Sequence, residues 1–163
     1  MRTSLLHILS TGLSRRGVLL PIAVYLLALW GFLGSPYARS GFPLDDAWIH
    51  RVYARSVAFG LGFAYNDGEQ EAGSTSPLWA IVTAPAHWLE GAGEGTVPAA
   101  VKLIGVFLGL AALAAVIRIG ARLGGSALAG FFAAAIFALE PRFLLSSLAG
   151  MENILLVSRW VWG

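Results

Sequence analysis

The chain has 163 residues, of which 57% are hydrophobic and 12% charged, and its mean hydropathy is +0.72. This leaves too little polar surface to cover a soluble globule, so part of the covering must come from lipid. The formal charge of +2 comes from scattered basic residues without a basic stripe or tail, which argues against nucleic acid as a partner, and the lack of cysteine excludes disulfides, thiolate catalysis and zinc–cysteine sites.

The first transmembrane helix is expected at about residues 17–34. This run has no charge, follows Arg15-Arg16, and at about 1.5 Å per residue nearly spans a hydrocarbon core of about 30 Å. A cleavable signal peptide is the alternative, but its apolar core would be about 7 to 15 residues and no clean small-x-small site follows Trp30. Since arginines stay in the cytoplasm by the positive-inside rule, residues 35–76 are expected to form an outer loop.

This loop is the polar part of the sequence, because it holds five of the nine acidic residues, namely Asp45, Asp46, Asp67, Glu69 and Glu71. Between Asp46 and Phe59 the apolar residues fall near one helical face, which predicts an amphipathic helix resting at the membrane interface. The members of that face are Trp48, Ile49, Val52, Tyr53, Ser56 and Val57, while His50, Arg51 and Arg55 lie elsewhere. Gly60 and Gly62 are expected to end this helix.

Further helices follow the loop. Residues 77–89 begin with proline at the first helical position, but their apolar run of twelve residues covers only about 18 Å, so a re-entrant or interfacial segment is preferred to a full crossing. Residues 99–117 and 123–139 are expected to span the membrane, and a last helix covers residues 153–163. The fold class predicted is therefore an all-α, polytopic transmembrane protein.

The orientation of the later helices depends on the short segment. If residues 77–89 cross the membrane, strict alternation places Arg118 and Arg122 outside, against the positive-inside rule. If they are re-entrant or interfacial, both arginines face the cytoplasm, and Glu152 then lies on the same outer face as the Asp45-Asp46 pair. We prefer the second arrangement, in which acids over a hundred residues apart could share one site.

The adjacent carboxylates Asp45 and Asp46 open the predicted interfacial helix. One acid could cap free backbone N–H groups at the positive end of the helix dipole, and this is favoured on the dipeptide alone. Two carboxylates beside a membrane repel each other, however, so one could carry a raised pKa and act as a general base, or the pair could hold a divalent cation. Arg51 and Arg55 could clamp a phosphate or contact lipid head groups.

The remaining polar residues have simpler interpretations. Glu152 opens an apolar stretch and marks either a helix end or a functional carboxylate. His7, His50 and His87 lack metal-ligand spacing, so isolated structural or interfacial histidines are expected. Trp79, His87 and Trp88 have the character of membrane-interface anchors.

Five segments in a fixed order together resemble one family. They are Asp45-Asp46-Ala47-Trp48-Ile49, Arg51-Val52-Tyr53-Ala54-Arg55, the run from Gly60 to Glu69, the run from Glu71 to Trp79, and Ser147-Leu148-Ala149-Gly150-Met151-Glu152-Asn153. This series resembles the start of bacterial GT-C membrane glycosyltransferases of the family-39-like kind, which includes mycobacterial-type terminal arabinofuranosyltransferases. It covers most of residues 17–155, and Asn153 stands where the family pattern leads us to expect threonine.

The resemblance implies transfer of a sugar from a polyprenyl-phosphate donor to a glycan, lipid or protein acceptor at the outer face of the cytoplasmic membrane. Asp45 or Asp46 would act as base on the acceptor hydroxyl, and Glu152 matches a second acidic position near the same cavity. Arg51 and Arg55 would bind the donor phosphate, whose departure needs positive charge or a divalent cation. Tyr53 and Glu71 complete the implied substrate-binding set.

Two alternatives to a transferase stay open. One is a non-catalytic polytopic membrane protein such as a transporter segment or assembly subunit, although a transporter should place ionisable groups near mid-membrane. The other is an inert truncated product. Members of the resembled family are much longer than this chain, and the chain stops a few residues into its last apolar segment, so the sequence predicts an N-terminal fragment.

Overall fold

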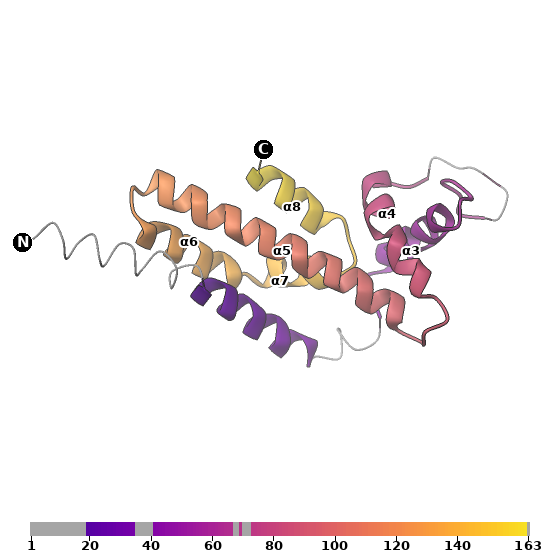
Figure 1. The fold of residues 1–163 in the computed structure, drawn as a ribbon, viewed down its shortest axis with the longest axis horizontal. Coiled ribbons are helices and arrows are strands. Elements are labelled where there is room, and N and C mark those ends of the chain that lie inside the picture. Colours follow the sequence, from indigo (N-terminus) through magenta and orange to yellow (C-terminus); the bar gives the residue numbers. More distant parts are fainter. Residues whose placement is uncertain (1–18, 35–40, 67–68, 70–72, 163) are drawn as a thin grey trace, which may run out of the picture.

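The computed structural model describes residues 19–34, 41–66, 69 and 73–162, apart from the side chains of residues 159–162. Its ordered elements within that part of the chain are helices joined by turns, with no β-strand. The expected all-α class is therefore confirmed. The helices divide into a long bundle and a smaller group at one end of it (Figure 1).

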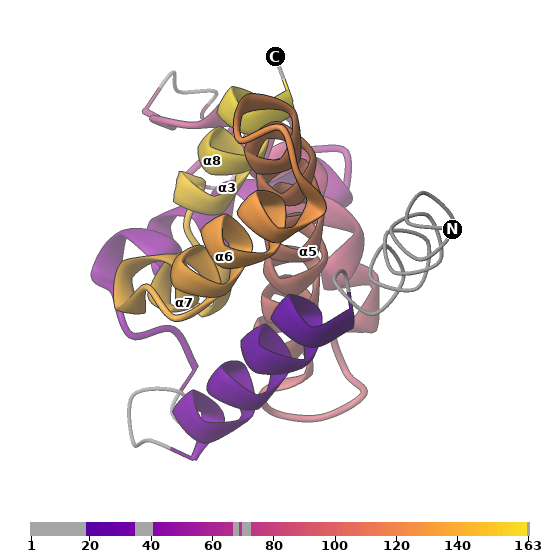
Figure 2. The same ribbon diagram turned by 90° about the vertical axis from the view of Figure 1, so that its left-hand side faces the viewer.

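The bundle is organised around α5 (Thr96–Leu123), which runs along most of the molecule. Packed with it are the unlabelled helix Leu19–Leu33, α6 (Ala127–Ala138), α7 (Pro141–Leu148) and α8 (Asn153–Trp162). The end-on view shows α6 and α8 beside α5, with the helix Leu19–Leu33 below them (Figure 2).

The smaller group, which we call the α3–α4 module, consists of residues 41–66 and 73–95. It contains α3 (Asp45–Ala58), α4 (Pro77–Thr83) and the 3-10 helix η1 (Ala84–Leu89). The helix ends follow local chemistry, because α4 begins with proline at a position that needs no N–H, and α3 stops before Gly60, whose φ of +76° favours glycine. Both boundaries agree with the sequence analysis.

The possible membrane spans are few. By length and composition, α5 is the only helix of the described residues that could cross a bilayer alone. The helices α6 and α7 would make a second span if the pair, bent by 66°, acts as one. The helix Leu19–Leu33 is apolar but shorter than a full span. The described helices thus supply one crossing, or two.

One helix boundary differs from its predicted place. The sequence predicts a break around Arg118 and Arg122, but α5 continues through both arginines to Leu123. Arginine is a good helix former, whereas the turn that follows contains Gly125 with a φ of +62°. The break therefore occurs at the glycines, and α6 is correspondingly shorter than the predicted 123–139 helix.

Small residues allow the bundle helices to approach closely. A Cβ atom on Gly105 would meet the Ser147 carbonyl oxygen, and one on Gly109 would meet the Tyr25 hydroxyl. In this space Tyr25 Oη donates a 2.7 Å hydrogen bond to Ser147 Oγ, which in turn donates to the Phe143 carbonyl at 3.0 Å. The helix Leu19–Leu33 is thus tied to α7 across α5.

A buried tryptophan joins the α3–α4 module to the loop between α7 and α8. Trp79 is 1% exposed, and its Nε1 donates a 2.9 Å hydrogen bond to the Gly150 carbonyl. Gly150 has a φ of +73°, and a Cβ there would meet the Phe42 ring. The interpretation of Trp79 and His87 as membrane-interface anchors is wrong, because both are buried inside the chain, whereas Trp88 is exposed.

Candidate functional site

The helix α3 has a buried face that differs from the predicted one. The residues turned inward are Ala47, His50, Tyr53, Ala54 and Ser56. His50, which the sequence analysis set apart from the apolar face, is 3% exposed, while Trp48 and Ile49 of the predicted face stay 38% and 40% exposed. The apolar periodicity did not predict this buried face, because a polar side chain can be buried when another element supplies its partner.

The partner of His50 comes from the far end of the sequence. His50 Nε2 lies 2.9 Å from Glu152 Oε2, in the loop that precedes α8. The contact is close but poorly aligned, since Glu152 Oε2 makes no regular hydrogen bond, and we regard it as an electrostatic contact. His50 Nδ1 is also buried without a hydrogen-bond partner among the described residues. The last of the resembling segments therefore contacts α3, the helix that carries the first two.

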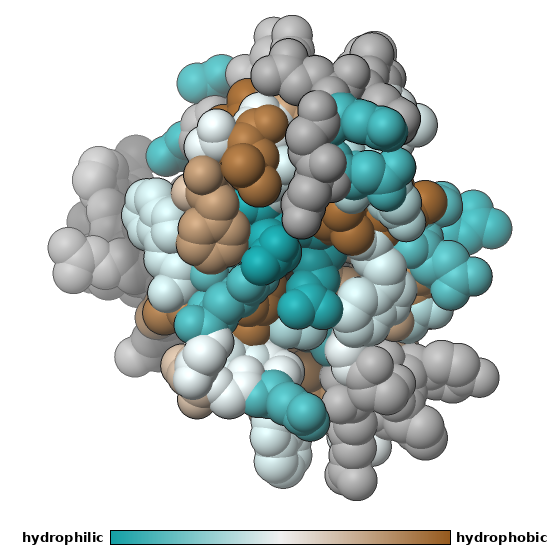
Figure 3. Space-filling model, turned by 90° about the vertical axis from the view of Figure 1, so that its right-hand side faces the viewer, coloured by the Kyte–Doolittle hydropathy of each residue, from teal (hydrophilic) through white to brown (hydrophobic). Residues whose placement is uncertain are grey.

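The opposite, exposed side of α3 lines a hollow of about 380 Å³. Asp45, Arg51, Arg55 and Tyr65 lie around it, so three of the predicted site residues share one surface. The Arg51 guanidinium stacks over the Trp48 ring at 5.3 Å, which holds its charge beside the hollow. Figure 3 shows hydrophilic side chains gathered at this end of the molecule, bordered by hydrophobic ones.

The two adjacent aspartates occupy different positions around α3. Asp45 lines the hollow with Arg51, whereas Asp46 lies one turn before His50 on the i, i+4 row. Both are exposed in the first helical turn, and the N-cap residue is Leu44, which has no side-chain cap. The capping interpretation is therefore wrong, although both carboxylates still face the positive end of the helix dipole.

Tyr53, one of the predicted substrate-binding residues, does not line this hollow. Tyr53 is 2% exposed, with its ring 5.9 Å from that of Tyr65 and its hydroxyl against Gly73. Its position is that of a packing residue within the α3–α4 module. Glu71 lies outside the described residues.

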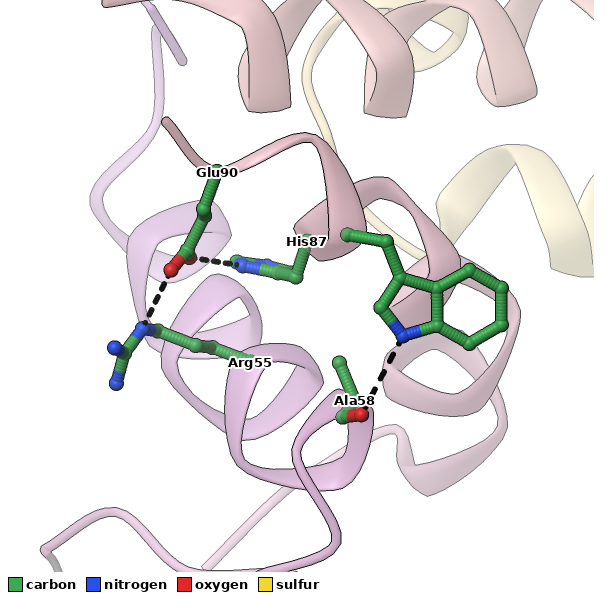
Figure 4. A network of polar contacts seen from close by, with 5 residues as sticks. Arg55, Ala58, His87 and Glu90 are labelled. Atoms are coloured by element: carbon green, nitrogen blue, oxygen red, sulfur yellow. Dashed lines mark hydrogen bonds and ion pairs between the residues drawn. The ribbon is translucent and has the colours of Figure 1, made fainter. Parts of the chain in front are cut away.

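Arg55 takes part in a polar network that links α3 to η1 (Figure 4). Its Nε atom lies 3.0 Å from Glu90 Oε2, and the other carboxylate oxygen of Glu90 lies 2.6 Å from His87 Nδ1. Nearby, Trp88 Nε1 is 3.5 Å from the Ala58 carbonyl. Arg55 is thus engaged with a carboxylate, whereas Arg51 makes no ion pair with the residues that the structure describes.

The network shifts two pKa values. Burial lowers the pKa of His87, because desolvation of the imidazolium outweighs the attraction of Glu90. Burial alone would raise the pKa of Glu90, but hydrogen bonds from His87 and Arg55 hold that pKa below its usual range. Around neutral pH, Glu90 is therefore ionised and His87 is predominantly neutral.

The described residues do not fit a divalent-cation site by themselves. No group of three or more histidine, aspartate or glutamate side chains converges within this part of the chain. Asp45 and Asp46 point to different sides of α3, whereas calcium and magnesium prefer about six or more converging oxygen ligands. No metal-dependent step is derived from these residues.

Two further hollows follow the first one in a row. One of about 320 Å³ shares Arg51 with the α3 hollow. The other residues of its lining are Glu90, Gly91, Gly93, Glu94, Gly95, Val97 and Pro98. The other, a mostly apolar cleft of about 400 Å³, shares Gly95 and Pro98 with the second hollow and contains Lys102. The shared lining residues set the three hollows side by side.

Several residues of this region were missed in the sequence analysis. His50 follows Asp46 at i, i+4, and His87 precedes Glu90 at i, i+3, which are spacings that signal neighbours on one helical turn. Lys102 interrupts an otherwise uncharged apolar run, a pattern that marks functional positions in membrane helices. The contact of His50 with Glu152 had no local signal, because the two lie over a hundred residues apart.

Comparison of the chain with protein-family models, with curated proteins and with solved structures found no match. A functional interpretation therefore depends on the chain's own motifs and on the geometry described above.

Proposed function

We propose that the chain is the N-terminal part of a multi-pass GT-C-like glycosyltransferase of the bacterial cytoplasmic membrane. It would transfer a sugar from a polyprenyl-phosphate donor to a glycan, lipid or protein acceptor, with the α3–α4 module on the outer face. The observation that carries the proposal is the contact between His50 and Glu152 at 2.9 Å. It brings the last of the ordered segments that resemble this family against α3, the helix that carries the first two.

The arrangement of charges in the α3 hollow supports a displacement at the sugar's anomeric carbon. The acceptor hydroxyl oxygen forms the new bond to this carbon, and its proton passes to the Asp45 carboxylate. The bond from the anomeric carbon to the phosphate oxygen breaks, and the electron pair leaves with the polyprenyl phosphate. Arg51, which lines the same hollow, stabilises the negative charge that develops on the phosphate.

The other predicted site residues take supporting roles in this proposal. Glu152 contacts His50 on the buried side of α3, where it is a second acidic group beside the helix that carries Asp45. Arg55 is held by Glu90, so it contributes positive potential at the rim while Arg51 contacts the leaving phosphate. Asp46 lies on the His50 row, outside the lining of the hollow, so Asp45 is the preferred base of the pair.

The position of charge along α5 favours a transferase over a transporter. Lys102 lies six residues into a helix of 28 residues, or roughly 9 Å from its start at about 1.5 Å per residue. That is near the end beside the α3–α4 module and far from the helix centre. A transporter would instead concentrate ionisable groups near the bilayer midplane.

The test is transfer of radiolabelled sugar in membranes from cells that express this gene, supplied with polyprenyl-phosphate-linked pentoses and hexoses. Asp45→Asn is expected to lower transfer by about 100-fold or more, because it removes the base while conserving shape. Trp88→Ala serves as the control, since Trp88 is 70% exposed and lies outside the hollow.

Membrane insertion of each variant is checked by carbonate extraction of the membranes. Full transfer by both Asp45→Asn and Asp46→Asn in properly inserted protein would remove the catalytic assignment. Failure of the wild-type membranes to use any polyprenyl-phosphate sugar would remove the proposed function itself.

A further inference from the structure

Glu90 lies at the centre of the polar network between α3 and η1 (Figure 4). One of its carboxylate oxygens is 2.6 Å from Nδ1 of His87, a residue that is 1% exposed, and the Glu90 backbone N–H donates to the His87 carbonyl at 3.0 Å. Burial alone would raise the pKa of Glu90, but its hydrogen bonds hold that pKa below the usual range, so the carboxylate is ionised. Since an ionised carboxylate only accepts hydrogen bonds, the His87 proton lies on Nδ1. The buried histidine thus sets the direction in which Glu90 presents its second oxygen.

The second oxygen of Glu90 holds Arg55 at the rim of the α3 hollow. Arg55 Nε donates a 3.0 Å hydrogen bond to Glu90 Oε2, and the guanidinium lies 5.4 Å from the centre of the Phe59 ring. The side chains of Arg55 and Glu90 are 53% and 25% exposed, so water weakens their attraction. Arg55 therefore borders the hollow with its charge already matched by a carboxylate.

Arg51 lies one helical turn before Arg55 and has a different environment. It borders both the α3 hollow and the hollow next to it, and it stacks on Trp48 without an ion pair to any described residue. Residues at i and i+4 are neighbours on a helix surface, so both guanidinium groups could reach one anion if Glu90 did not hold Arg55. Glu90 thereby decides whether the α3 hollow offers one cation or two.

The number of available guanidinium groups discriminates between anions by charge. A phosphate diester carries one negative charge, whereas a monoester carries about −1.5 to −2 near neutral pH. One arginine matches the diester, and a second arginine adds more to the binding of the monoester. In the proposed reaction the donor is a diester and the leaving group is a monoester, so a single available arginine limits retention of the product.

We propose that Glu90 is a positioning residue that holds Arg55 at the rim, leaves Arg51 as the cation available in the α3 hollow, and so favours a phosphate diester over a monoester. The inference rests on the proposed function for the identity of the two phosphates, whereas the placement of Arg55 is measured without sugar transfer. Glu90 acts through Arg55 and does not contact the reacting atoms.

The first test measures the reactivity of the two arginines towards phenylglyoxal. The complete chain in nanodiscs is labelled, and peptide mass spectrometry gives the ratio of modification at Arg55 to that at Arg51. Glu90→Gln should raise this ratio about three-fold or more, because Arg55 loses an ion pair of modest strength. A general loosening of the fold would expose both arginines and leave the ratio unchanged.

Glu94→Gln is the matched control. Glu94 is an exposed glutamate four residues after Glu90, and it makes no ion pair with a residue that the structure describes. Its substitution removes the same charge from the same hollow lining without releasing Arg55, so the labelling ratio should stay at the wild-type value.

The second test measures charge selectivity with soluble anions. Protection of Arg51 from phenylglyoxal is titrated with phenyl phosphate, a monoester, and with methyl phenyl phosphate, a diester. Glu90→Gln should shift the ratio of the two apparent Kd values about three-fold or more in favour of the monoester. In an Arg55→Gln background, Glu90→Gln should have no effect beyond that of Glu94→Gln, because no arginine is left for Glu90 to hold.

Four results would overturn the inference. They are an unchanged labelling ratio in Glu90→Gln, an equal rise in Glu94→Gln, no protection of Arg51 by either anion, or a selectivity shift that persists without Arg55. If the arginine results are as predicted but membranes use no polyprenyl-phosphate sugar, the proposed function alone is removed. If transfer depends on Asp45 but the labelling ratio is unchanged, this inference alone is removed.

Discussion

The bundle and the α3–α4 module pack their helices through different kinds of residue. In the bundle, glycine and alanine bring backbones together, and Tyr25 and Ser147 form its buried side-chain hydrogen bond. The module instead buries polar side chains of several elements, among them His50, Thr83 and His87. Close backbone packing suits helices in lipid, while buried polar groups with defined partners fix the geometry that a site requires.

The largest expected change in stability follows substitution of Trp79, the residue that joins the two regions. Trp79→Ala removes a fully buried ring and its hydrogen bond to Gly150, and should lower the free energy of unfolding by about 3–5 kcal/mol. Thermal unfolding in detergent measures this loss. Trp88→Ala is the matched control, because that ring is 70% exposed and its removal should change stability little. Equal effects of the two substitutions would contradict the described junction.

Substitution of a closely packed glycine in the bundle should change stability less, and a second, unpacked glycine serves as the control. Gly105→Ala should lower the free energy of unfolding by about 1–3 kcal/mol, because its Cβ would collide with the Ser147 carbonyl. Gly31→Ala places the same methyl group where nothing lies within 4 Å, so the better helix propensity of alanine should stabilise slightly. If both variants shift the melting temperature in the same direction, close packing at Gly105 is wrong.

The smallest expected effect is the pH response of the module. The folded-state pKa of His87 lies below its ordinary value of 6.5, so the unfolded chain binds a proton more readily as the pH falls below 6.5, and stability declines. The lowered pKa of Glu90 adds a second loss as the pH falls below 4.5.

His87→Gln should remove the first of these losses and leave the second. Melting temperatures of the wild type and variant, measured between pH 8 and pH 4, test this directly. A wild type whose stability rises as the pH falls from 7 to 5.5 would show that the sign is wrong.

Local sequence signals predicted much of this structure. Gly60 ended α3 and Pro77 began α4 as expected, because both depend on backbone conformations that few residues satisfy. Helical spacing predicted that Arg51 and Arg55 lie one turn apart, while their grouping with Asp45 was implied by the family resemblance. The multi-pass arrangement is still a prediction, since α5 is the one described helix that could span a membrane by itself.

These local signals did not predict contacts between residues that lie far apart in the sequence. His50 was placed on the polar side of α3 because periodicity counts apolar residues and cannot foresee that Glu152 approaches from the other end of the chain. Trp79 was assigned to the membrane surface because its role depends on the Gly150 carbonyl. In both cases tertiary contacts, which spacing along one helix does not encode, decided the environment of the side chain.

The central claim is that His50 of α3 and Glu152 of the loop before α8 meet in the folded chain, and the proximity of residues 50 and 152 tests it most directly. The chain has no cysteine, so His50→Cys combined with Glu152→Cys gives a unique pair for a short bismaleimide crosslinker. We predict efficient intramolecular crosslinking in native membranes, and little for a control pair of His50→Cys with Leu123→Cys, which joins α3 to the far end of α5. Equal yields for the two pairs, or no crosslink at residues 50 and 152, would contradict the account.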